Sequence, residues 1–212
     1  MEEIKKKSGS KLLWVIIILA VIILVVVGYF YIFGKSGSLK FVDKFNELQA
    51  PAKEIKDNLS SAGSIFQGVA DKETKKDYAG IISDLQAALA SFSKAETLVT
   101  STDSTLNELQ SMINASSDQN IKTTGASFIE AFKSRNAAIV KTATDGKNFA
   151  NLAITYYTEL MNNQKITVDT ASINDVANTL TVDADNNVNV GKQYDTAASD
   201  FGKAAGFTIE KQ

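Results

Sequence analysis

The sequence predicts an all-α protein, in which a single N-terminal transmembrane helix is followed by an elongated, antiparallel helical bundle of the four-helix type. Two observations carry this prediction. The stretch from Leu12 to Phe33 contains no charged residue. Beyond it, apolar residues recur at alternating intervals of three and four, which is typical of helices packed side by side in a left-handed bundle.

The composition excludes several classes of function. The 212 residues include no histidine and no cysteine, which excludes disulfides, zinc fingers, thiol nucleophiles and every histidine-based catalytic arrangement. The 22 basic and 24 acidic residues nearly balance, and Arg135 is the single arginine, so no nucleic-acid partner is expected. We expect no cofactor and no metal.

The apolar stretch has the length and the flanks of a membrane anchor. About 20 helical residues cross a hydrocarbon core of about 30 Å, and Trp14, Tyr29 and Tyr31 stand at the ends of the run as interfacial anchors. Leu12 to Phe33 is therefore expected to lie in the lipid bilayer. Two alternatives are a signal peptide cleaved after Ser38 and a buried helix of a water-soluble protein.

Lysine placement predicts the orientation of this anchor. Four lysines crowd the short N-terminal side, and three follow the run within about 15 residues. We expect residues 1–11 to be a basic cytoplasmic tail, residues 12–33 the span, residues 34–38 a linker and residues 39–212 an extracytoplasmic bundle. The expected localisation is the cell membrane, with a single pass.

The periodic region divides into helical stretches at short polar breaks. The apolar period runs through residues 42–69, 78–113 and 121–160, with turns expected at 71–76 and 115–119. Pro51 is expected to kink the first stretch or mark its true start. The second is expected to break within 100–105, and Asp145-Gly146 is a candidate interruption of the third.

The C-terminal stretch keeps the period less well, because Asp183 and Asn187 occupy positions on the apolar face. We expect a short helix near Ser172–Leu180, a loop over Asp183–Asn187 and a final helix to about Ala205. A small hairpin, pairing Thr181-Val182 with Val188–Val190, is the alternative.

Three matches to known motifs are incomplete. Asp183, Asp185 and Asn187 match the start of a calcium loop, but Val188 and Tyr194 stand where that loop needs glycine and glutamate. Ser91 and Lys94 have serine-lysine nucleophile spacing without the companion motifs, and Asp200-Phe201-Gly202 spells a kinase motif without its partners. We assign no catalytic, cofactor-binding or metal-binding residue.

Arg135 is the one charge on the apolar face of the third stretch. It either lines a cavity and binds an anion, or extends its guanidinium to the surface, or the face shifts by one residue to Asn136.

These observations favour a non-enzymatic, membrane-anchored bundle of the cell envelope that acts by contact with another envelope protein, with itself or with the cell surface. The alternative is a ligand-binding or sensory bundle that signals through a separate membrane protein. A cavity lined by Arg135, Tyr156 and Tyr194 would favour the sensor, and a filled core with an exposed apolar stripe would favour contact. The contact surface is expected within Val168 to Gln212.

Overall fold

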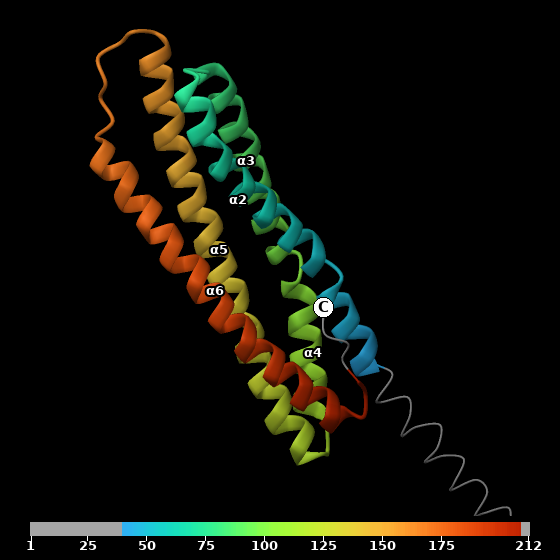
Figure 1. Ribbon diagram of the computed structural model, residues 1–212. Coiled ribbons are helices and arrows are strands. Elements are labelled where there is room, and N and C mark those ends of the chain that lie inside the picture. The colour runs from blue at the N-terminus through green and yellow to red at the C-terminus, as the bar shows by residue number, and fades with distance from the viewer. Residues whose placement is uncertain (1–39, 209–212) are drawn as a thin grey trace, which may run out of the picture. The chain divides into compact units, whose positions relative to one another are not determined.

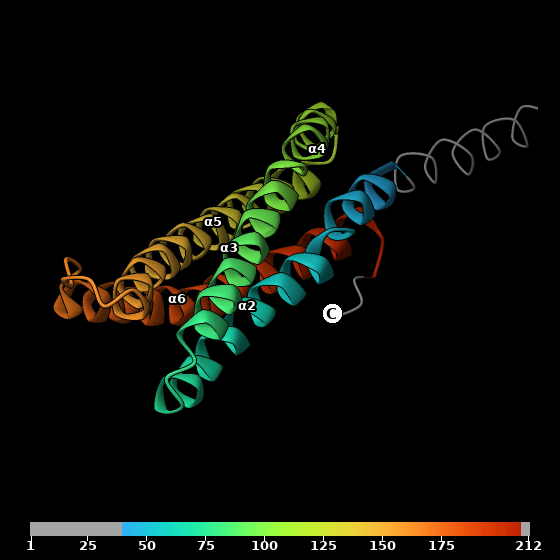
Figure 2. The same ribbon diagram turned by 90° about the horizontal axis from the view of Figure 1, so that it is seen from above.

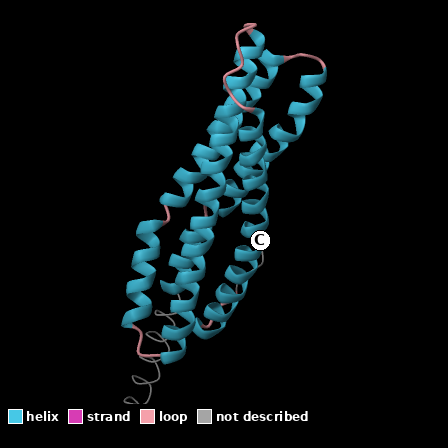
Figure 3. Cartoon of the chain, turned by 90° about the vertical axis from the view of Figure 1, so that its left-hand side faces the viewer, coloured by secondary structure: helices cyan, strands magenta, loops and turns pink. Residues whose placement is uncertain are grey.

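The computed structural model describes residues 40–208, and every regular element in that range is a helix (Figure 3). Residues 40–49 are helical, and the helices that follow are α2 (Ala52–Thr74), α3 (Tyr78–Thr100), α4 (Asp103–Ala115), α5 (Gln119–Met161) and α6 (Thr170–Ala205). The all-α prediction is confirmed for these residues. The predicted span at 12–33 and the linker lie outside them, and none of the helices described is long and apolar enough to cross a membrane.

The predicted breaks near Pro51, within 100–105 and at 115–119 are confirmed, while the turn expected at 71–76 is confined to residues 75–77 because α2 continues to Thr74. Three of the four breaks have a local cause. Pro51 follows the helix at 40–49 and precedes α2, whose Ile55 amide donates to the Pro51 carbonyl at 2.9 Å. Asp77 caps α3 by accepting from the Gly80 amide at 3.0 Å. Asp118 caps α5 in the same way, accepting from the Asn120 amide at 2.7 Å.

Within the compact unit that begins at Asp43, the closely paired helices are α2 with α3, α3 with α5, and α5 with α6, while α4 continues along α5 (Figures 1 and 2). Short turns reverse the chain between α2 and α3 and between α4 and α5, so these neighbours are antiparallel. The pair α2 and α6 lacks comparable backbone contact. α2 and α6 are therefore not closely paired.

One antiparallel register runs along the whole of α3, α4 and α5. Gly146 of α5 lies against Phe92 of α3, and Gly125 lies against Ile113 of α4. Between these two contacts, Asn136 donates a hydrogen bond to Thr102 at 3.1 Å. From one contact to the next, the residue number on α3 and α4 rises by the same amount as the residue number on α5 falls. The break at Ser101 therefore leaves the register unchanged.

The core changes in composition along the bundle. One end is aromatic, because Phe128 is fully buried with ring centroids of four neighbours within 6.0 Å: Phe45, Phe132, Tyr194 and Phe201. In the middle of the bundle most buried side chains are small, with Ala62, Ala88 and Ala143 around Phe92. Alanine side chains bury little apolar area, and burial contributes roughly 25 cal/mol per Å². The alanine layers therefore add less hydrophobic stabilisation than the aromatic layers.

The predicted interruption at Asp145-Gly146 is wrong, because α5 continues unbroken from Gln119 to Met161. Gly146 serves a different purpose. A Cβ atom at this position would lie 2.3 Å from Cζ of Phe92, so the glycine allows α3 and α5 to approach closely.

The predicted loop over Asp183–Asn187 and the alternative hairpin are also wrong, because both fall inside α6. Asp183 is 5% exposed, and both of its carboxylate oxygens accept from Nζ of Lys141 at 2.7 Å. Asn187 donates to the Thr142 hydroxyl at 2.6 Å. These partners on α5 satisfy the polar groups on the buried face, so the helix does not break there.

Candidate ligand-binding site

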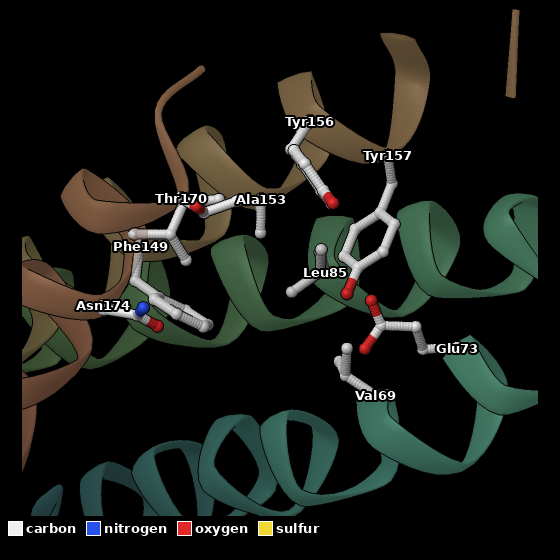
Figure 4. A pocket seen from close by; sticks show the side chains of 10 residues that line it. Val69, Glu73, Leu85, Phe149, Ala153, Tyr156, Tyr157, Thr170 and Asn174 are labelled. Atoms are coloured by element: carbon white, nitrogen blue, oxygen red, sulfur yellow. The ribbon is translucent and has the colours of Figure 1, made fainter. Parts of the chain in front are cut away.

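A cavity of about 210 Å³ opens on the side of the bundle where α2 and α6 are not closely paired. We call it the α2–α6 cavity. Its walls come from the C-terminal part of α2, from α3, from the last third of α5 and from the start of α6 (Figure 4). Ten residues line it: Val69, Glu73, Leu85, Phe149, Ala153, Tyr156, Tyr157, Thr170, Ile173 and Asn174.

The base of the cavity belongs to the core. Leu85 is fully buried and Ala153 is 3% exposed, and the two pack in one cluster with Ile81, Ala150 and Tyr157. Alanine at position 153 is one reason for the space, since a larger side chain there would project into it.

A tyrosine and a carboxylate face each other across the cavity. The Tyr157 hydroxyl points at the Glu73 carboxylate and hydrogen-bonds to it (Figure 4). Burial raises the pKa of Tyr157 to about 12, and the nearby charge of Glu73 adds to the effect. Tyr157 is therefore neutral near pH 7 and acts as the donor, with the Glu73 carboxylate as acceptor.

Aromatic rings form much of the remaining wall. The rings of Tyr156 and Tyr157 meet edge to face, with centroids 5.2 Å apart. Phe149 meets Phe66 of α2 in the same geometry at 4.8 Å. Edge-to-face pairs of this kind are energetically favourable, so the rings of the wall pack against one another as well as against the core.

A buried glutamate holds the connection between α5 and α6. Glu159 accepts from the Thr167 amide at 2.8 Å and from the Thr167 hydroxyl, and these hydrogen bonds lower the pKa of Glu159. Asp169 then caps α6 by accepting from the Ala171 amide at 3.0 Å. Together these contacts place Thr170 and Asn174 at the cavity.

The structure separates the residues that the sequence grouped as a candidate cavity. Tyr156 lines the α2–α6 cavity, but Arg135 and Tyr194 do not. The Arg135 guanidinium lies over the Tyr194 ring, 4.8 Å from its centroid. Asn136 is buried and bonded to Thr102, so the shift of the buried face from Arg135 to Asn136 is confirmed.

The partial motifs form no site. Asp183 is paired with Lys141 inside a helix, and Lys94 pairs with Glu54 at 2.5 Å. Phe201 is a fully buried core residue. Across residues 40–208, no group of three acidic side chains is placed to hold a metal ion.

Sequence reasoning missed the two central residues of the cavity. Glu73 falls in a predicted turn, and Tyr157 is one position from Tyr156, which the apolar period selected. The adjacent tyrosines are the one signal in the sequence for this wall.

No protein-family model, curated protein or solved structure matches the chain.

Proposed function

We propose that this protein is a membrane-anchored, non-enzymatic helical bundle that binds a small ligand in the α2–α6 cavity. The observation that carries the proposal is a recess with an apolar base and a few convergent polar groups, which is the usual composition of ligand sites. At about 210 Å³ the cavity is smaller than most sites for drug-sized ligands, so the ligand is small.

Binding rather than catalysis fits the groups around the cavity. Tyr157, with a pKa of about 12, is a poor acid or base near neutral pH. Glu73 is an exposed carboxylate, and the hydroxyl that it faces, that of Tyr157, is held protonated by its raised pKa. A ligand that bridges α2 and α6 would change the spacing of two helices that are otherwise loosely paired, which is a means of signalling to a partner protein.

The anchor and the location belong to the same proposal. The charge-free run Leu12 to Phe33 holds the bundle at the cell membrane, and the lysines before it place the bundle on the extracytoplasmic side.

Filling the cavity tests the proposal. In Ala153→Leu, the added carbons project into the space that a ligand would occupy, while Ala137→Leu makes the same change at an exposed position of α5. Full-length protein in non-ionic detergent is screened against a library of small polar metabolites by thermal shift, because a ligand that binds only the folded state stabilises it by RT ln(1 + L/Kd), where L is the free ligand concentration. We expect compounds that stabilise the wild type and Ala137→Leu but not Ala153→Leu. Hits that stabilise all three proteins equally, or an absence of hits, would refute the proposal.

Contact with another protein is the second candidate function. Within residues 40–208 the exposed large apolar side chains all lie on α5 and α6: Val140, Met161, Val182 and Val188. Val182 and Val188 are 66% and 58% exposed, but they are six positions apart, so they point about 120° apart around the helix. A Val182→Ser, Val188→Ser double variant that loses a partner recovered by the wild type, while Ala153→Leu keeps it, would favour this function.

A further inference from the structure

The one ionised side chain that lines the α2–α6 cavity is negative. Glu73 is the one charged residue among the ten that line it, and no lysine or arginine does. It lies in the last turn of α2, where the carbonyl end of the helix adds a partial negative charge. The electrostatic field at this end of the cavity therefore favours a cation.

No side chain neutralises this carboxylate in the part of the chain that is described. The neighbouring Lys72 pairs with Asp84 at 2.7 Å. Lys75 and Lys76 follow in an exposed turn, and neither makes an ion pair with Glu73 or lines the cavity. The hydrogen bond from Tyr157 uses part of the acceptor capacity of the carboxylate and leaves the rest available.

The aromatic wall suits the same kind of ligand. Aromatic faces carry negative electrostatic potential and attract ammonium groups that lie within about 6 Å of a ring. Tyr156, Tyr157 and Phe149 all reach this cavity, and both tyrosine side chains are on the Glu73 side of it (Figure 4). A carboxylate beside aromatic faces is the usual environment of a bound organic cation.

We infer that the α2–α6 cavity binds a small organic cation, with its alkylammonium head between Glu73 and the tyrosine rings and its apolar part against Leu85 and Phe149. Thr170 and Asn174 are placed to hydrogen-bond a polar group at the other end of the ligand. This inference rests on the proposed function and names the ligand class of the same site.

The test compares three probes of one shape and different charge. The probes are choline, its uncharged isostere in which carbon replaces the ammonium nitrogen, and the carboxylate derived from that isostere. Binding to the full-length protein is measured by equilibrium dialysis in a non-ionic detergent without choline lipids. Glu73→Gln removes the charge and keeps the shape. Glu130→Gln is the matched control, an exposed glutamate more than five turns of α5 away from Ala153.

We expect choline to bind with a Kd of about 1 mM or tighter, and the isostere to bind at least tenfold more weakly. Glu73→Gln should weaken choline at least tenfold, Glu130→Gln should leave it unchanged, and the carboxylate should not bind. Equal binding of choline and the isostere, an unchanged Kd in Glu73→Gln, or no binding of any probe overturns the inference. If the isostere or the carboxylate binds best and Ala153→Leu abolishes that binding, the cation is refuted while the ligand site stands.

Discussion

Replacing Gly146 by alanine tests the close approach of α3 and α5. The new Cβ would meet the tip of the Phe92 ring, with three ring carbons at 2.3, 2.5 and 2.7 Å. Ordinary carbon contacts lie near 3.5 Å, so the ring or the helix must move by about an ångström. Phe92 is 3% exposed and packs against Phe66, with ring centroids 5.7 Å apart, so the ring has little freedom to turn away.

Two opposing free energies set the magnitude. Overpacking a core costs about 1–3 kcal/mol, and the short distances place this site at the upper end of that range. Alanine gains up to about 1 kcal/mol over glycine inside a helix. We expect a net loss of about 2 kcal/mol, which corresponds to a Tm lowered by about 4–8 °C for a domain of this size.

Gly191→Ala is the matched control for this experiment. Gly191 lies inside α6, and a Cβ there would meet no atom within 4 Å. This variant should gain about 0.5–1 kcal/mol from helix propensity alone. Both proteins are melted under identical conditions and followed by far-ultraviolet circular dichroism. If Gly146→Ala is as stable as Gly191→Ala, the glycine is not needed for helix packing and the reasoning fails.

Four further results are expected. Phe128→Ala should cost about 3–5 kcal/mol in chemical denaturation, because the ring is fully buried among aromatic neighbours, and a loss below about 1 kcal/mol would contradict that placement. Tyr194→Phe should stabilise by about 1 kcal/mol, since it removes a buried hydroxyl that has no hydrogen-bond partner; a clear destabilisation would mean that the hydroxyl is bonded. The pKa of Tyr157 is raised from 10.0 to about 12, so the contribution of protonated Tyr157 to the stability of the fold is complete below about pH 10 and is lost as the pH rises through about 12. The absorbance of tyrosinate, compared between the wild type and Tyr157→Phe, measures this pKa, and titration of Tyr157 near pH 10 would refute the prediction. The pKa of Asp145 is lowered chiefly by its hydrogen bond with the Lys141 ammonium, so its contribution to stability is present above about pH 4 and is lost on further acidification; an acid unfolding curve unchanged in Asp145→Asn would contradict this.

The C-terminal end, where the sequence predicts the contact surface, is packed against the bundle at Phe207. The Phe207 ring packs against Phe45 and Phe201, with centroids 5.4 and 5.8 Å away. Removing residues from Phe207 onward should therefore lower the Tm, whereas a free contact surface predicts loss of a partner at unchanged Tm. The exposed apolar side chains of α5 and α6 are the better candidates for contact.

Local sequence was enough to determine the class of fold and the main breaks. The alternation of three and four is a property of the helix itself, so the helical stretches follow from it without knowledge of their partners. Pro51 acts on the backbone within a few positions, and its effect was predicted for the same reason. The caps Asp77 and Asp118 also act locally, at the two turns that the polar residues predicted.

Tertiary structure decided the cases in which one sequence signal has two outcomes. Glycine at position 146 reads as a helix breaker, but the nearness of Phe92 turns it into a packing position. Asp183 and Asn187 read as a loop until Lys141 and Thr142 supply partners from α5. The α2–α6 cavity is of the same kind, because Glu73 and Tyr157 are 84 residues apart and meet only after two antiparallel reversals of the chain. Apolar periodicity reports which face of a helix is buried, but not what lies opposite that face, and the polar pairs and the cavity depend on the opposite face.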